Sequence, residues 1–293
     1  MTSAETAKPE VIDFRVRLPL ELRPSQEMPV DYQMQYDRVF DQLPERRQQT
    51  LADLTAEMEA NDVGHAVVHA EYEHGDVADA LNEAVAKVVA KDPDRFSGYG
   101  TISMAPIKIP RALAQVQRVA NLGLRGLSLQ PSFLGIAIDE RALYPVYAKA
   151  AELGLHVALH TGINYTVSFP MRNDQPLQLD QVACDFPDLV LIACHAGWPW
   201  VPEMVAVLRK HPNVYAEFGG LAPRYVCEGG TGWSVMFRFM NTLLAGQVLY
   251  GTDWPTFPMG RALAEWRASG LREHVLAGLL SGNARRLLTR SPQ

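Results

Sequence analysis

Polar residues able to do chemistry recur at one kind of place in this sequence, the ends of short, branched, apolar segments. They are Arg15, Arg17, His69, Gln130, His160, His195, Glu217 and Asp253. Histidine titrates near neutral pH and serves as a general base, carboxylates accept protons, and guanidinium groups hold a fixed positive charge. Because the carboxyl ends of parallel strands meet at one rim of a barrel, we expect these side chains to converge there.

The segment VIDFRVR, residues 11–17, carries two of these groups in an otherwise apolar strand. Strand side chains alternate, so we expect one face to hold Asp13, Arg15 and Arg17 and the other Ile12, Phe14 and Val16. A guanidinium keeps its proton at neutral pH and must be neutralised when it is buried.

Two interpretations of the arginine pair stay open. In the first, Arg15 and Arg17 bind a substrate carboxylate or a developing oxyanion, which guanidinium forks match in geometry and charge. In the second, they pair with acidic side chains of the chain itself, for which the candidates are Asp253, Glu217 and Glu71. The two can hold in different ligand states.

The elements that must position these residues alternate along the chain. Strand patterns lie at 11–17, 65–69, 97–103, 124–130, 155–160, 189–195, 213–218 and 248–253. Helical periodicity lies at 50–62, 77–92, 109–123, 139–154, 200–212, 260–270 and 272–288, with Asp139 as an N-cap and Gly123 and Gly154 as C-cap glycines. The chain lacks a GxGxxG fingerprint, so the pattern predicts an α/β fold of the (β/α)8 TIM-barrel type rather than a dinucleotide-binding sheet.

We expect one domain over 11–293, preceded by a disordered tail over 1–10. Two long irregular stretches, 18–49 and 162–178, follow the first and fifth strands, where loops shape the mouth of a barrel. The formal net charge of -6 argues against a nucleic-acid or membrane-surface partner. Three scattered cysteines and no apolar leader indicate a reducing cytoplasm, and we expect a homo-oligomer, by default a dimer.

Six segments, in order, carry a resemblance to a known family: IDFRVR, ALHTG, LIACHAGWPW, NVYAEFGG, LYGTDWP and GNARRLL. Together they resemble the amidohydrolase superfamily, in the branch that includes aminocarboxymuconate-semialdehyde decarboxylase, aromatic-acid decarboxylases and pyrone-dicarboxylate hydrolase. The resemblance implies a divalent metal, often zinc, held at the positions of Arg15, Arg17, His160 and Asp253. It also implies that His195 activates water or polarises the substrate.

Two of the four implied ligands are therefore arginines, which cannot ligate a cation and which repel one. We expect no metal cofactor; the alternative is one divalent ion such as zinc on His160, His195 and Asp253. Gln130 stands where binuclear relatives carry a carboxylated lysine, so a binuclear centre is not expected. Cys194 precedes His195 and, by strand alternation, is expected to face the helices.

The sequence thus predicts a metal-independent or weakly metal-binding hydrolase of a small cyclic or aromatic acid derivative. The catalytic residues are His195, Asp253 and His160; the arginines are expected to lower the pKa of Asp253 and to keep a nearby histidine neutral. Substrate contacts are assigned to Arg15, Arg17, His69, Arg172 and Trp198. The alternatives are a decarboxylase or lyase of aromatic or muconate-type carboxylates, with or without a metal, and a degenerate barrel with a binding role.

Overall fold

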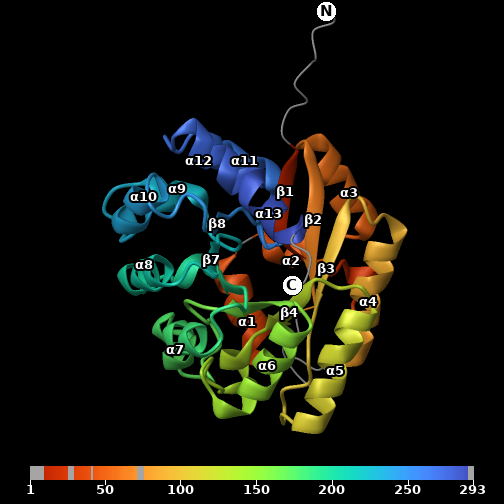
Figure 1. Cartoon of the computed structure of the whole chain (residues 1–293). Helices are drawn as coiled ribbons and strands as arrows, with labels where there is room; N and C mark the ends of the chain where they lie inside the picture. Colours follow the sequence, from red (N-terminus) through yellow and green to blue (C-terminus); the bar gives the residue numbers. More distant parts are fainter. Residues whose placement is uncertain (1–9, 26–29, 41, 71–75, 290–293) are drawn as a thin grey trace, which may run out of the picture.

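A computed structural model of the chain describes residues 10–25, 30–40, 42–70 and 76–289. Eight parallel strands form one sheet in the order β1 to β8 (Figure 1). The ends of the sheet meet, because the Arg17 N–H donates to the Trp254 carbonyl at 2.8 Å and the Asp253 N–H donates to the Arg15 carbonyl at 2.9 Å. The predicted (β/α)8 barrel is confirmed, and all but one residue of the expected tail lies outside the described residues.

The strands are short and their ends coincide with the polar positions. They are β1 (Val11–Arg17), β2 (Val63–His69), β3 (Phe96–Gly100), β4 (Gly126–Leu129), β5 (His156–His160), β6 (Leu191–Cys194), β7 (Val214–Glu217) and β8 (Val248–Leu249). Parallel strands joined through helices all run the same way around the barrel, so these carboxyl ends share one rim.

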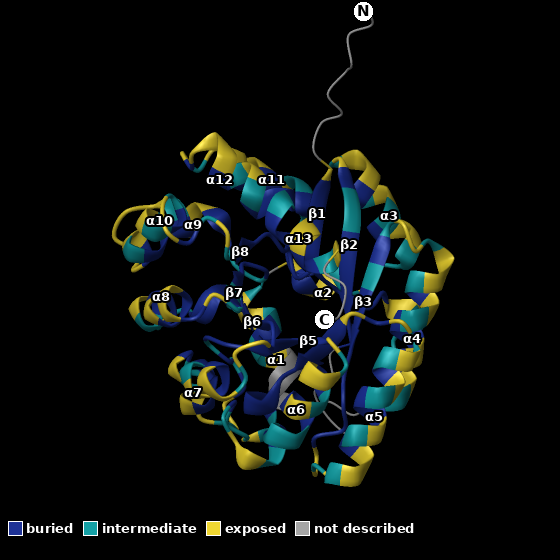
Figure 2. Cartoon of the chain, in the orientation of Figure 1, coloured by how far each residue is buried: buried dark blue, intermediate teal, exposed yellow. Residues whose placement is uncertain are grey.

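Helices connect the strands, and most of them cover the outside of the barrel with their exposed faces outward (Figure 2). They are α1 (Val30–Val39), α2 (Leu43–Arg46), α3 (Leu51–Ala60), α4 (Ala78–Lys91), α5 (Ile109–Asn121), α6 (Tyr144–Glu152), α7 (Leu177–Asp185), α8 (Val201–Lys210), α9 (Pro223–Cys227), α10 (Ser234–Met240), α11 (Met259–Arg267), α12 (Glu273–Ala277) and α13 (Asn283–Thr289). Among the described residues, none of these helices combines the length and apolarity that a membrane span requires.

The core has two layers, as a closed sheet requires. The larger lies between strands and helices and contains residues such as Val16, Val68 and Leu159. The smaller fills the lower barrel interior with Ile12, Phe14, Val67, Tyr99, Ile192 and Cys194, among others. Most of the polar positions singled out in the sequence lie above this layer, at or just beyond the carboxyl ends of the strands.

The expected alternation along β1 is wrong at its centre. Phe14 belongs to the barrel interior, with its ring 5.8 Å from that of Tyr99, while Val16 packs toward the helices. The pairing of β1 with β2 shifts register between Asp13 and Val16, and such a bulge resets which face a side chain occupies. The adjacent side chains of Phe14 and Arg15 therefore both point into the barrel.

Three further local expectations differ from the structure. Asp139 does not cap a helix: a 3-10 turn (Arg141–Leu143), capped by Glu140, leads into α6. The stretch 18–49 contains α1 and α2, and 162–178 contains a 3-10 turn (Met171–Asp174) and the start of α7. Cys194 faces the barrel interior and not the helices. β6 ends at Cys194, and His195 lies beyond the strand with a positive φ of 65°, so the alternation of the strand does not extend to His195. Gly123 and Gly154 adopt the left-handed conformation expected after a helix end.

Candidate active site

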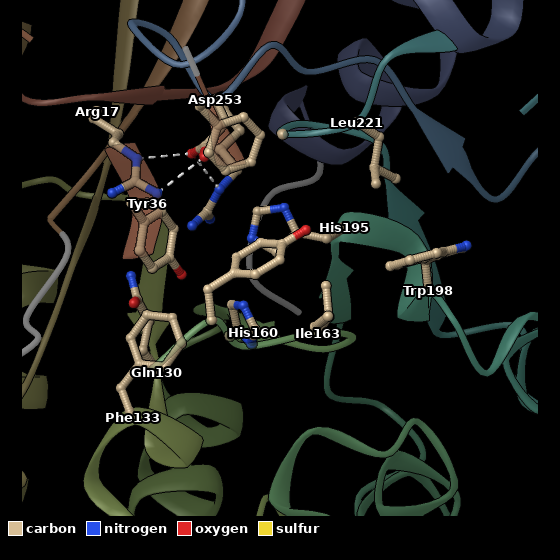
Figure 3. A pocket seen from close by; sticks show the side chains of 14 residues that line it. Arg17, Tyr36, Gln130, Phe133, His160, Ile163, His195, Trp198, Leu221 and Asp253 are labelled. Carbon is tan, nitrogen blue, oxygen red and sulfur yellow. Dashed lines mark hydrogen bonds and ion pairs between the residues drawn. The ribbon is translucent and has the colours of Figure 1, made fainter. Parts of the chain in front are cut away.

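A pocket of about 470 Å³ opens at the carboxyl ends of the strands (Figure 3). Its lining comes from six strand ends and from the loops after β1 and β5: Arg15, Arg17, Tyr36, Phe40, Gln130, Phe133, His160, Ile163, Tyr165, His195, Trp198, Gly220, Leu221 and Asp253. Both long stretches singled out in the sequence thus supply walls.

Two arginines hold one carboxylate on the β1 and β8 side of the pocket. Arg17 donates from Nε to Asp253 Oδ1 at 3.1 Å and from its terminal nitrogen to Oδ2 at 3.0 Å. Arg15 donates from Nε to the same Oδ1 at 3.0 Å. Arg15 is buried, whereas the Arg17 side chain is 18% exposed and borders the hollow. The arrangement places two fixed positive charges and one carboxylate at the pocket wall.

The charges of the arginines decide the state of Asp253. Burial by itself would raise the pKa of this carboxyl, but Arg17 and Arg15, followed by His195, hold the pKa well below its usual value. Asp253 is therefore ionised at any working pH, and a carboxylate with so low a pKa is a weak base.

Asp13 braces the seam that carries this cluster. It accepts from the Thr252 hydroxyl at 2.5 Å, from the Thr252 N–H at 3.0 Å and from the Arg15 N–H at 3.1 Å. Burial raises its pKa to about 7, and these hydrogen bonds oppose that rise. By tying β1 to the end of β8, Asp13 holds Arg15 and Asp253 in register.

Glu217 lies beside Arg15 below the pocket. One of its oxygens accepts from the Gly219 N–H, and the other is 4.0 Å from Arg15 Nε. Burial is the main reason that its pKa rises to about 8, although Arg15 opposes the shift. A glycine at 251 leaves space for the carboxyl, because a Cβ there would lie 2.0 Å from Glu217 Oε1.

His69 supports Arg15 rather than the pocket. Its Nδ1 accepts from an Arg15 terminal nitrogen at 3.3 Å, and its Nε2 donates to the Phe14 carbonyl at 2.9 Å. The side chain is fully buried and does not line the hollow. Burial, then the Arg15 charge, pushes the pKa of His69 well below its usual value, so the ring is neutral.

Two imidazoles occupy the β5 and β6 side, with their ring centroids 4.9 Å apart. His195 donates from Nδ1 to the Gly219 carbonyl at 2.6 Å, which leaves Nε2 as a lone-pair acceptor. Burial and the Arg15 charge lower the pKa of His195 well below its usual value. His195 is thus neutral, as the sequence predicts for a histidine near arginines.

His160 forms a dyad with an acid that the sequence analysis missed. Its Nδ1 lies 2.8 Å from Oδ1 of Asp174, a fully buried carboxylate in the loop after β5. Asn164 donates to the other oxygen of Asp174 at 3.4 Å. A carboxylate on Nδ1 fixes the tautomer with Nε2 as the acceptor and stabilises the imidazolium that forms when Nε2 takes a proton. Asp174 ends the short 3-10 turn in the loop after β5, where no periodic spacing marks it.

Gln130 lines the pocket with a carboxamide that makes no hydrogen bond to the described residues. The side chain is buried, and neither its oxygen nor its nitrogen has a hydrogen-bond partner among the described residues. It borders the hollow on the Phe133 side (Figure 3). Since an unsatisfied buried amide costs free energy, a polar ligand group is the partner that would satisfy it.

Aromatic rings close the outer side of the pocket. Tyr36 comes from α1, Phe40 directly follows this helix, and Tyr165 comes from the loop after β5. Tyr165 meets Tyr36 edge-on at 5.5 Å and Phe40 edge-on at 5.9 Å. Such walls fit a flat ring.

Of the remaining residues predicted to bind substrate or to pair with the arginines, one lines the pocket. Trp198 lines the pocket, whereas Arg172 is exposed and lies outside the lining. Glu71, one of the suggested partners of the arginines, falls outside the described residues.

A family model described as amidohydrolase matches residues 12–290. The chain belongs to this family. It is 24% identical over 248 residues to the 2-amino-3-carboxymuconate-6-semialdehyde decarboxylase of Dictyostelium discoideum, covering 74% of this chain and 67% of that protein.

Two solved structures extend the comparison. An uncharacterised TIM-barrel protein from Bordetella bronchiseptica is 28% identical, with a TM-score of 0.79 over 95% of this chain and 98% of that one. The 5-carboxyvanillate decarboxylase of Sphingomonas paucimobilis is 18% identical, with a TM-score of 0.74 over 97% and 100% of the two chains. At that identity the second match supports the fold alone.

The metal that the amidohydrolase resemblance implies does not fit the residues present. Arg15 and Arg17 occupy two implied ligand positions, and their guanidinium groups engage both oxygens of the implied carboxylate ligand, Asp253. A cation placed there would meet two fixed positive charges. Within the described part of the chain, three potential ligand atoms come within 4.8 Å of one another at Asp180, Cys184 and His211, outside this pocket.

Proposed function

We propose that this amidohydrolase is a metal-independent hydrolase of a small cyclic or aromatic acid derivative. One observation carries the proposal: guanidinium groups are bound to Asp253 where a metal would stand, while two imidazoles opposite keep an acceptor nitrogen. Positive charge and general base are thus both supplied by side chains.

The arginine side binds the anion in this proposal. Arg17 borders the pocket while Asp253 holds it through Nε and one terminal nitrogen, and its charge attracts a substrate carboxylate. Arg15 adds its charge from below. Fixed positive charge at this wall also stabilises the oxyanion that develops when water attacks an acyl carbon.

The histidine side activates water. His160 Nε2 takes the proton of the attacking water, Asp174 stabilises the imidazolium, and the same proton passes to the departing oxygen when the acyl bond breaks. His195, held neutral, offers a second acceptor nitrogen that orients the water. Asp253 acts as the anchor of the arginines and not as the base, because its low pKa makes it a poor proton acceptor.

Gln130 completes the contacts in this scheme. Its carboxamide can donate one hydrogen bond and accept another, so it binds a polar substituent on the substrate ring. The aromatic side chains of Tyr36, Phe40 and Tyr165 pack against the substrate ring in stacked or edge-on contacts.

Decarboxylation is the second candidate, because the curated relative reported above is a decarboxylase. The arginines would hold the carboxylate beside the one that leaves, and a protonated histidine would deliver the proton that replaces carbon dioxide. The two reactions differ in product rather than in binding.

The deciding experiment treats the purified protein with a chelator and offers a panel of lactones, esters and free aromatic acids. Acid release and carbon dioxide release are measured separately. We expect acid release that survives the chelator. Activity that is lost to the chelator and restored by zinc would overturn metal independence, and carbon dioxide without acid release would establish the lyase.

A further inference from the structure

The pocket does not end at its aromatic wall. A second hollow of about 1350 Å³, here called the outer chamber, shares five lining residues with it: Phe40, Tyr165, Trp198, Gly220 and Leu221. Two hollows that share five lining residues adjoin one another, and Trp198 and Leu221, on one side of the inner pocket, are two of the shared residues (Figure 3).

The lining of the outer chamber includes none of Arg15, Arg17, His160, His195 and Asp253. Its far walls come from α9, from the residues before α10 and from the segment between β8 and α11. Val226, Trp233 and Phe257 are buried there, and Tyr225 stands at the rim with 47% of its surface exposed. Trp233 is backed by Phe218, 6.0 Å away, and Phe257 by Phe40, 5.9 Å away.

Two arginines in the chamber lie flat on aromatic rings. The Arg224 guanidinium is 4.8 Å from the centre of the Tyr225 ring, and that of Arg261 is 5.4 Å from the centre of the Phe257 ring. Glu265 accepts from the guanidinium Nε of Arg261 at 2.9 Å and from the backbone N–H of Arg224 at 3.1 Å, so it holds the Arg261 side chain and the main chain at Arg224. Planar guanidinium groups placed over aromatic rings extend the flat walls of the chamber.

A channel that only admits water would not require a lining of aromatic rings. Apolar rings beside a reaction site lower the free energy of ligand binding when an apolar group of the ligand is buried against them. The chamber is the larger of the two hollows, and its lining is largely aromatic or aliphatic. The group that fits it is flat and apolar rather than small and charged.

We propose that the substrate has two parts: an acid-bearing ring in the inner pocket and a second, aryl-type group in the outer chamber. This inference rests on the proposed function for the first part and adds the second. The chamber then determines which of many possible ring acids the enzyme prefers.

The test compares matched ligands by calorimetric titration. One set contains benzoate and its three monohydroxy derivatives, and the other contains the three biphenyl carboxylates. We expect the best biphenyl acid to bind at least about tenfold more tightly than the best one-ring acid, because a second ring is buried.

Two variants locate that gain. Ala222→Phe fills the chamber from a residue that does not line the inner pocket, and Tyr225→Ala truncates an exposed rim residue that the fold does not require. Both should remove most of the gain and leave one-ring affinity unchanged. Ala264→Phe, on the exposed face of α11, is the matched control and should change neither.

Each outcome decides. One-ring acids that bind while biphenyl acids bind no better would overturn the two-part substrate and leave the proposed function standing. A gain that persists in both variants would place the second ring outside the chamber and overturn the inference as well. Failure of every acid to bind would overturn the proposed function itself.

Discussion

The two sides of the pocket differ in which of their hydrogen-bonding atoms are already used within the protein. On the β1 and β8 side, both oxygens of Asp253 accept from guanidinium nitrogens, and the backbone beneath is tied by Asp13. On the β5 and β6 side, each histidine uses one ring nitrogen to orient itself and retains the other as an acceptor. One side supplies fixed charge and the other supplies exchangeable protons.

In the proposed function this division replaces what a metal does at one point, since a metal both attracts anions and prepares water as a nucleophile. The proposal assigns these two tasks to different residues, so substitutions on each side test the two tasks separately.

Removing the base should have the largest effect. His160→Ala is expected to lower kcat by about 10²- to 10⁴-fold, the usual contribution of a general base, with little change in KM. Asp174→Asn should lower kcat in the same direction but less, since the imidazole remains. Steady-state kinetics on the hydrolysed substrate measures both, and an unchanged kcat in His160→Ala would assign the base elsewhere.

Removing the positive charge of Arg17 should weaken the binding of carboxylate ligands. Arg17→Ala is expected to weaken carboxylate ligands by ~2 kcal/mol, roughly 30-fold, because a charge-assisted contact is lost. Arg17→Lys keeps the charge without the fork and should recover part of the affinity. If titration gives the wild-type Kd for Arg17→Ala, the arginine serves only to hold Asp253.

Converting the charged side to a ligand side sharpens the comparison further. The double variant Arg15→His with Arg17→His places two imidazoles beside a released Asp253 and near His160, so we expect it to bind zinc, whereas the wild type does not. Elemental analysis after zinc dialysis measures the difference. Absence of zinc in a folded double variant would mean that the side chains at 15 and 17 do not project where His160 and Asp253 can join them.

The sequence predicted the barrel and most of the charged rim because strand ends and helix periods are local signals. Arg15, Arg17, His160, His195 and Asp253 all lie at the ends of apolar strands, and parallel topology then brings them together. Their positions follow from the pattern alone.

The residues that the sequence did not indicate depend on loops and on a bulge. Asp174 reaches His160 through an irregular loop whose path no periodicity encodes, and Tyr36 enters the pocket from α1, a helix inside a stretch expected to be irregular. The inward turn of Phe14 follows from the shift in register within β1, which changes the face without changing the composition.

The last prediction concerns the stability of the charged side rather than activity or ligand binding. In the folded protein Glu217 has a pKa of about 8, against 4.5 as its ordinary value. Between these values the folded chain holds a proton that the unfolded chain has lost, so the contribution of Glu217 to the free energy of unfolding falls as pH rises.

Glu217→Gln removes that proton exchange and keeps an oxygen for the Gly219 N–H. The difference in unfolding free energy, variant minus wild type, should therefore become more positive from about pH 5 to about pH 8 in urea titrations. Glu228→Gln changes an exposed carboxyl and should give a flat difference. A flat difference for Glu217→Gln would mean that Glu217 stays ionised beside Arg15, and that the positive charge of the arginine side is matched more fully by the chain itself than its burial indicates.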